Sequence, residues 1–315
     1  MNKAVVYMDI LGFSNAVMSS VEEAILTLSS FNTILHSGII EKRLHPSTNA
    51  DPRIRDLAKR TSIECFEEFI PFSDSVFATS QSCDDFIMQL GHFALGSFKF
   101  TSHIYRDTKS PDDPTLTYSL GLGIENGQPC VVKTPIHQPP VLFRAGLAYG
   151  DVQKLKPLAL VDGISKTIDT LAGEAVVRAA KLETIGIKGP RFVFKQDLYG
   201  QLSDDVKCYC RIAPEQCDLY EVLWPAMGFT TENASWQEFD NFTELFEPAY
   251  NLWYPFKHAN NEKVAIHYCK FIELIIASTI KIYDKKWNAK NEAINKISNI
   301  LKDKDLMYDF SYLLN

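Results

Sequence analysis

Apolar residues in the first hundred positions form short unbroken runs that alternate with helically spaced stretches. The apolar run at 3–8 has no turn residue and predicts a buried strand. Apolar residues then recur every three or four positions over 20–36, which predicts an amphipathic helix. Residues 63–72 and 75–79 predict the two strands of a hairpin with Ser73 and Asp74 at its bend. A second helix is predicted over 84–103, capped by Ser82 or Asp84.

The same pattern continues with shorter elements. Residues 117–124 and 130–133 predict a hairpin, because the Asn126-Gly127 pair between them is a strong turn signal. Residues 141–148 predict a strand, and 163–186 contain a further helix that is clearest at 175–183. Two more strands are predicted at 191–194 and 219–223. From about Trp236 the composition becomes aromatic and then helical, with helices expected over 262–283 and 285–301.

The order strand, helix, two strands, helix, strand is the split, ferredoxin-like arrangement of an α+β fold. A polar excursion at 45–60, which contains Pro46 and Pro52, reads as an exposed insertion. We therefore expect an α+β domain over residues 1–225 and a helical C-terminal extension over 226–315 that packs on it.

Composition excludes several classes of function. The formal charge of the 315-residue chain is −7, which argues against a nucleic-acid surface, since such a surface needs an excess of lysine and arginine. The apolar segment that ends at Asp9 is too short for a signal peptide or a spanning helix, so no membrane association is expected. The seven cysteines are scattered and odd in number, which indicates reduced thiols in a cytoplasm.

Two acidic residues lie where an apolar strand is predicted to end. Asp9 closes the first strand and Asp74 lies at the hairpin bend, and these places are neighbours in a split β-α-β-β fold. Taken singly, Asp9 reads as a helix cap and Asp74 as a turn residue. Together they form a like-charge site that favours a divalent cation, which in proteins is held by one or two carboxylates plus substrate phosphates.

Four motifs in the right order resemble those of class III adenylyl and guanylyl cyclases. Residues 7–14 (Tyr-Met-Asp-Ile-Leu-Gly-Phe-Ser) resemble the family's metal-binding opening, and 73–77 resemble its second aspartate hairpin. Residues 143–152 are similar to its Arg-x-Gly strand, and 173–183 to its Ala-Ala-Arg-Leu-Glu helix. The resemblance spans roughly residues 3–223 and implies a ferredoxin-like cyclase catalytic domain with insertions.

The resemblance also implies roles for particular residues. Two Mg²⁺ or Mn²⁺ ions per site would be held by Asp9, Asp74 and the backbone carbonyl of Ile10, and the substrate-binding turn would consist of Leu11, Gly12, Phe13 and Ser14. The family works as a homodimer in which the metal aspartates of one subunit meet the helix residues of the other. The catalytic cations expected on the partner's triphosphate are Lys181, Arg178 and Arg144. For Arg144 a salt bridge at the strand edge is an equal alternative.

Departures from the family pattern concern the substrate. The family's transition-state asparagine falls on Val177 and its arginine on Lys181, which keeps the charge but loses the bidentate fork. The two purine-selecting positions fall on Ile70 and Thr170, so both lack the family's purine readers. Substrate ATP or GTP is therefore disfavoured, although a purine cyclase and an inactive nucleotide-sensing domain stay open as alternatives.

These features resemble the pyrimidine cyclases of bacterial Pycsar anti-phage systems, whose Gly-Pro-Arg-Phe segment is similar to residues 189–192. That resemblance implies a cytoplasmic bacterial enzyme that makes cyclic UMP or cyclic CMP for a separate effector protein. Ile70 and Thr170 do not distinguish UTP from CTP, and the preference for UTP, a uridylate cyclase, comes from the resemblance alone.

Overall fold

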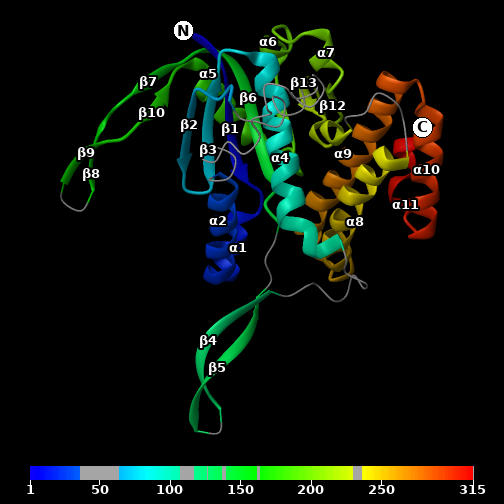
Figure 1. The fold of residues 1–315 in the computed structure, drawn as a ribbon. Helices are drawn as coiled ribbons and strands as arrows, with labels where there is room; N and C mark the ends of the chain where they lie inside the picture. The colour runs from blue at the N-terminus through cyan, green and yellow to red at the C-terminus, as the bar shows by residue number, and fades with distance from the viewer. Residues whose placement is uncertain are drawn as a thin grey trace, which may run out of the picture.

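The computed structural model describes residues 1–35, 64–106, 117–125, 127–136, 140–161, 164–229 and 236–314. It is an α+β fold built on a seven-stranded sheet with the order β12-β13-β11-β6-β1-β3-β2. Figure 1 shows this sheet with the C-terminal helices beside it and two β-ribbons that extend away from the body. The α+β prediction is confirmed.

The centre of the sheet has the split arrangement that the sequence predicted. Strand β1 (Asn2–Ile10) lies between β6 (Phe143–Asp151) and β3 (Ser75–Ser80) and is antiparallel to both. Strand β2 (Glu68–Phe72) pairs with the other side of β3. The connections are α1 (Phe13–Ser19) with α2 (Val21–Leu35), and α4 (Cys83–Arg106). The Ser82 hydroxyl accepts the Asp85 N–H at 3.3 Å, which confirms the predicted cap.

The other half of the sheet continues from β6. Strand β11 (Phe192–Phe194) lies parallel to β6, and β13 (Gln216–Val222) and β12 (Cys210–Ala213) follow antiparallel. Helix α5 (Glu174–Glu183) connects β6 to β11, and two short helices, α6 (Gln196–Tyr199) and α7 (Asp204–Lys207), follow β11.

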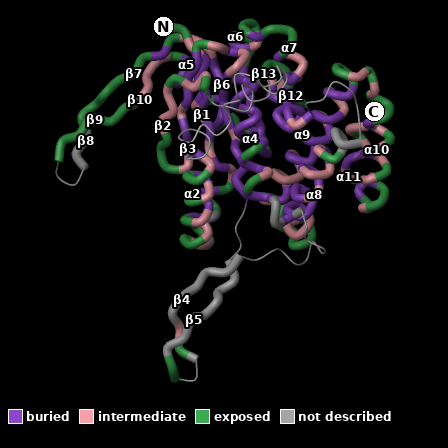
Figure 2. The backbone as a smooth tube through the Cα atoms, in the orientation of Figure 1, coloured by how far each residue is buried: buried purple, intermediate pink, exposed green. Residues whose placement is uncertain are grey.

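Alternating residues of β1 divide the core between the two faces of the sheet. Val6 and Met8 belong to the large core that includes residues of α2 and α4, whereas Val5 packs beneath α5 with Ala148 and Ala179. Figure 2 shows the central strands buried and the outer ribbons largely exposed where they are described. Asp9 lies on the α5 face, because it shares the alternation of Val5.

Two ribbons leave the body. The predicted hairpin is confirmed as β4 (Thr117–Glu125) and β5 (Gln128–Ile136). A second ribbon pairs β7 (Gln153–Leu155) with β10 (Thr170–Ala172) and β8 (Leu158–Val161) with β9 (Ile164–Thr167). The helix predicted within 163–186 therefore occupies only the second half of that stretch. The extended ribbon persists up to Gly173, whose φ of 135° and close approach to Asp151 allow the chain to turn into α5. The polar excursion at 45–60 lies outside the described residues.

The C-terminal region is helical, as predicted. It consists of η2 (Trp224–Gly228), α8 (Trp236–His258), α9 (Glu262–Trp287), α10 (Lys290–Asp303), α11 (Met307–Phe310) and η3 (Ser311–Leu314). Helix α8 packs on α4 and α9, and the Trp224 indole donates to the Pro190 carbonyl at 2.9 Å. The division at residue 225 stays a prediction. Within the described residues, no helix combines the length and apolar character that crossing a membrane requires.

Candidate active site

The sheet brings the two predicted metal-binding aspartates together. Asp9 is opposite Ser75 in the β1–β3 register, and the Ile10 N–H donates to the Asp74 carbonyl at 3.1 Å. The hairpin bend places Ser73 at a φ of 57° and presents Asp74 next to the end of β1. The carboxyl groups of Asp9 and Asp74 are close enough for the charge of Asp74 to raise the pKa of Asp9. Two acidic side chains 65 positions apart in the sequence thus face the same space.

A short chain of hydroxyl groups orients Asp9. The Ser75 hydroxyl donates to Asp9 Oδ1 at 3.0 Å, and the Tyr7 hydroxyl donates to Ser75 Oγ at 2.9 Å. All three residues lie on the α5 face of the sheet, because paired and alternate residues of antiparallel strands share a face. The second carboxyl oxygen of Asp9 is thereby directed away from Ser75.

The electrostatic environment of Asp9 is unfavourable to its charge. Burial raises the pKa of Asp9 to about 6, and the negative charge of Asp74 is the next cause; Glu183 adds to it, while the hydrogen bond from Ser75 opposes it. A carboxyl group with a pKa raised in this way is typical of a site built to receive positive charge.

Arg144 lies between two of these acids. Its Nη2 is 3.7 Å from Asp9 Oδ2, and its Nε donates to Glu183 Oε1 at the end of α5. Ionised Asp9, Asp74 and Glu183 with one guanidinium leave two negative charges uncompensated among these four residues. This balance suits divalent cations.

The donor set fits magnesium or manganese chemically. Carboxylate oxygens of Asp9 and Asp74, with the Ile10 carbonyl beside them, are the hard ligands that Mg²⁺ prefers. No group of three or more His, Cys, Asp or Glu side chains placed to hold a metal ion occurs within the described ranges. The missing ligands are those that substrate phosphates and water normally supply to Mg²⁺.

The predicted substrate-binding turn lies directly after Asp9. Gly12 has a φ of 84° and is exposed, Ser14 is exposed, and Phe13 is buried. The Leu11 N–H already donates to the Leu142 carbonyl at 2.8 Å, and the Ile10 N–H is also used. Leu11 therefore has no amide to offer a phosphate, and a backbone cradle is restricted to residues 12–14.

The two cationic residues predicted to act from α5 differ in whether they are already paired within the chain. Arg178 donates to the Tyr149 carbonyl at 2.5 Å. Its guanidinium also lies 3.0 Å from the carboxylate of Asp197 and 3.6 Å from that of Glu174. The first contact holds α5 to the far end of β6, and the second holds it to α6. Lys181 is exposed and has no ion pair within the part of the chain that the structure describes.

Distances along the strands separate the predicted residues into two groups. Arg144 is paired with Asp9, whereas Tyr149, which binds Arg178, is five residues further along β6, about 17 Å at the rise of a strand. Thr170 lies opposite Leu155 at the base of the second ribbon, also at the far end. Ile70 lies opposite Phe77 on the Asp9 face of the sheet. A single chain thus brings Asp9, Asp74, Arg144 and Ile70 to one end, and Arg178 and Thr170 to the other.

Three residues of this site were not singled out from the sequence: Tyr7, Ser75 and Glu183. Ser75 follows Asp74 directly, and its phase in the strand would have placed it on the Asp9 face. Only 4% of the Glu183 surface is exposed. The sequence did not indicate this burial, because a charged residue at the end of an amphipathic helix is expected on its exposed face.

Comparisons with known proteins concern the fold. No protein-family model matches the sequence, and no curated protein matches it. Matching solved structures include a bacterial light-regulated adenylyl cyclase, with a TM-score of 0.40 and 17% identity over 70% of this chain and 52% of that one. The adenylyl cyclase CyaB from P. aeruginosa matches with a TM-score of 0.40 and 14% identity, over 70% and 94% of the two chains. The guanylyl cyclase Cya2 matches with a TM-score of 0.40 and 11% identity, over 71% and 92%. This chain thus spans about half the length of the light-regulated enzyme and most of the other two.

Proposed function

We propose that this chain is a metal-dependent nucleotidyl cyclase that converts UTP or CTP into the 3′,5′-cyclic nucleotide and pyrophosphate. The observation that carries the proposal is the convergence of Asp9 and Asp74 at the end of β1, where burial and mutual repulsion raise the pKa of Asp9 to about 6. Such a pair is costly to the folded chain unless cations occupy it.

The chemistry follows from this geometry. Two bound divalent ions would neutralise the triphosphate and favour ionisation of the 3′-hydroxyl. Asp9 and Asp74, with the Ile10 carbonyl, would hold the ions at the end of the sheet, and Arg144, 3.7 Å from Asp9, would keep that carboxylate in place. The 3′ oxygen forms a bond to the α-phosphorus, its proton passes to solvent, and the bond to the pyrophosphate oxygen breaks. Catalysis is then mainly positioning and charge neutralisation.

The site is completed by a second copy of the chain in this proposal. Val177 is 52% exposed and Lys181 follows one helical turn later, so both lie on the open face of α5. The second ribbon also exposes large apolar side chains, at Leu155, Leu158 and Ile164. An exposed apolar strip of this kind supports a homodimer in which Lys181 acts on the triphosphate held by the partner's aspartates.

A pyrimidine substrate is favoured by the residues at the purine-reading positions. Ile70 has no polar side-chain atom, and the Thr170 hydroxyl is a single, uncharged group. Neither can reproduce a charged contact to a purine edge, on which discrimination by paired polar groups depends. The choice between UTP and CTP is left to experiment.

A four-substrate assay tests the proposal. Purified protein with Mn²⁺ is incubated separately with UTP, CTP, ATP and GTP, and cyclic products are identified by mass spectrometry. Conversion of UTP or CTP supports the proposal, whereas conversion of only ATP or GTP replaces it with a purine cyclase. No product with any substrate favours a nucleotide sensor, which the valine at position 177 would suit.

Matched variants test the metal assignment. Asp74→Asn should abolish turnover, while Asp205→Asn, an exposed carboxylate on α7, should leave it unchanged. Retained activity in Asp74→Asn would overturn the assignment. We further propose that the product is a second messenger in anti-phage defence, read by a separate cyclic-nucleotide-responsive effector in a bacterial cytoplasm. Phage challenge of bacteria carrying the effector with either variant tests that step.

A further inference from the structure

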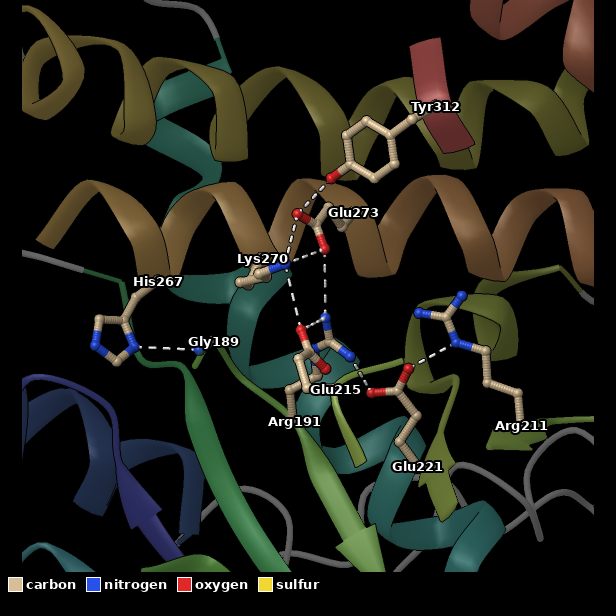
Figure 3. A network of polar contacts seen from close by, with 9 residues as sticks. All are labelled: Gly189, Arg191, Arg211, Glu215, Glu221, His267, Lys270, Glu273 and Tyr312. Atoms are coloured by element: carbon tan, nitrogen blue, oxygen red, sulfur yellow. Dashed lines mark hydrogen bonds and ion pairs between the residues drawn. The ribbon is translucent and has the colours of Figure 1, made fainter. Parts of the chain in front are cut away.

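A buried network of charged residues joins the sheet to the C-terminal helices (Figure 3). Arg191 just before β11 and Glu221 on β13 pair with each other, and both side chains have no exposed surface. Arg191 Nη2 also lies 3.6 Å from Glu273 of α9 and 3.5 Å from Glu215. This network places α9 directly against the loop that follows α5.

The charges of the network cancel. Its cations are Arg191, Arg211 and Lys270, and its anions are Glu215, Glu221 and Glu273. Lys270 donates to both oxygens of Glu273, and Tyr312 of η3 donates to Glu273 Oε1 at 2.6 Å. Three positive and three negative groups compensate each other, so the cluster has no charge left over to hold an ion. The network instead connects β13 and the segment before β11 to helix α9.

A second contact lies beside the network. The Gly189 N–H donates to His267 Nδ1 of α9 at 3.1 Å (Figure 3). A Cβ on Gly189 would stand 2.8 Å from Lys270 Cβ, and its φ is +88°. Only glycine permits this approach. Burial, together with the charges of Lys188 and Arg144, lowers the pKa of His267 to about 4, so at neutral pH the ring is uncharged and can accept the hydrogen bond.

The same short segment contacts the candidate active site. The Arg191 carbonyl accepts the N–H of Ala145 at 2.9 Å, and Ala145 follows Arg144 in β6. Arg144 in turn contacts Asp9 and Glu183. Contacts therefore run without a gap from α9 through residues 189–191 to the strand residue that carries the guanidinium beside the aspartates.

We propose that His267 and Arg191 are positioning residues through which the C-terminal helices set the place of Arg144 at the aspartate pair. The proposal rests on the proposed function only in treating that pair as catalytic. It gives the Gly-Pro-Arg segment a role that substrate binding does not explain. In this proposal the C-terminal helices help to set the geometry of the active site.

The test compares His267→Ala with two other variants. His267→Asn keeps an acceptor for the Gly189 N–H, and Asp309→Asn removes the ion pair between α8 and α11, in which Lys257 lies 2.6 Å from Asp309. The first readout is hydrogen exchange of the Ala145 amide, which requires no substrate. The second is kcat and KM for UTP with Mn²⁺.

His267→Ala should speed exchange of the Ala145 amide about tenfold or more relative to Asp309→Asn, because the hydrogen bond from Gly189 is lost and the segment that carries the Arg191 carbonyl is then held to α9 through Glu273 without it. It should lower kcat about tenfold with little change in KM, since a small displacement of a group at the reacting centre acts on the transition state. His267→Asn should restore both quantities. A general loss of stability would not be rescued in this way.

Equal Ala145 exchange in His267→Ala and Asp309→Asn would overturn the inference. A wild-type protein without turnover would instead overturn the proposed function, and the exchange measurement would still decide the coupling. If His267→Ala does not fold, Glu273→Gln gives the same comparison, because it keeps the side-chain shape and removes the charge that faces Arg191.

Discussion

Gly146 of β6 lies directly against Glu183 of α5: a Cβ on this glycine would stand 2.5 Å from the Glu183 backbone nitrogen and 2.1 Å from the Ala179 carbonyl oxygen. Helix α5 therefore rests on the backbone of the strand. This contact sets how far α5 stands from β6, and so where Glu183 meets Arg144, which lies two residues before Gly146 on the same face of the strand. Even a methyl group at position 146 would have to displace helix backbone.

Gly146→Ala should destabilise the protein by about 1–3 kcal/mol, the usual cost of overpacking a close contact. The urea midpoint of unfolding should fall without a change in m. Gly96 in α4 is the matched control, because a Cβ there meets nothing within 4 Å. Gly96→Ala should gain up to about 1 kcal/mol from helix propensity. Equal midpoints for the two variants would show that α5 does not rest on Gly146.

Asp9→Asn should make the protein more stable while removing its affinity for Mn²⁺. The pKa of Asp9 is about 6 in the folded chain and 3.8 in the reference state, so its ionisation costs stability above pH 6 and costs nothing below 3.8. This pKa shift corresponds to at most about 3 kcal/mol of lost folding free energy. Because Asp9 is partly exposed, we expect about 1 kcal/mol.

The measurement is urea unfolding of wild type and Asp9→Asn at pH 8 and pH 4, without divalent ions. The stabilisation should be full at pH 8 and reduced to a small fraction at pH 4. A variant that is less stable than wild type at pH 8 would show that Asp9 serves a structural purpose and is not held under repulsion from Asp74.

The sequence predicted the meeting of Asp9 and Asp74 because strand topology determines it. Once residues 3–8 and the hairpin around Ser73 are recognised as neighbours, the ends of those strands must coincide. The Arg144–Glu183 pair could not be predicted in the same way, since the rotamers and the height of α5 over Gly146 decide whether those side chains meet. Backbone register follows from local pattern, and side-chain contacts between elements do not.

The parts of the fold that were not predicted also have physical causes. The helical character of the C-terminal region was predicted but the bounds of α8 were not, because Pro248 and Pro255 interrupt the pattern that identifies a helix. Packing on α4 and α9 stabilises the helix across these prolines. The buried Arg191 network joins residues more than 80 positions apart, from Arg191 to Glu273. A single arginine just before a short strand gives no sign of such a partner.

Mn²⁺ affinity should fall as the pH drops through 6. The metal needs ionised Asp9, and with a pKa of about 6 only about a tenth of this carboxyl is ionised at pH 5. Affinity should therefore be about tenfold weaker at pH 5 than at pH 7, as measured from free Mn²⁺ by electron paramagnetic resonance. His267 does not interfere, since its pKa of about 4 lies below this range. Affinity that is constant from pH 5 to pH 7 would contradict the assignment of Asp9 as a ligand.

Lys181 and Asp74 should complement each other across the proposed dimer. Lys181→Ala and Asp74→Asn should each be nearly inactive alone, because every site in either homodimer lacks one of the two groups. Mixing equal amounts and allowing subunits to exchange makes half of the dimers hybrid, and one of the two sites in each hybrid is intact. Turnover should then return to about a quarter of the wild-type value.

Mixing Asp74→Asn with Asp9→Asn is the matched control, because both residues belong to the same half of the site. Each site of that hybrid lacks one aspartate, so no activity should return. Recovery in the first mixture and not in the second requires Lys181 and Asp74 to act from different subunits, which is consistent with the exposed place of Lys181 on α5. No recovery in the first mixture, with Lys181→Ala inactive on its own, would mean that Lys181 and Asp74 act within one chain, and the shared site would be overturned.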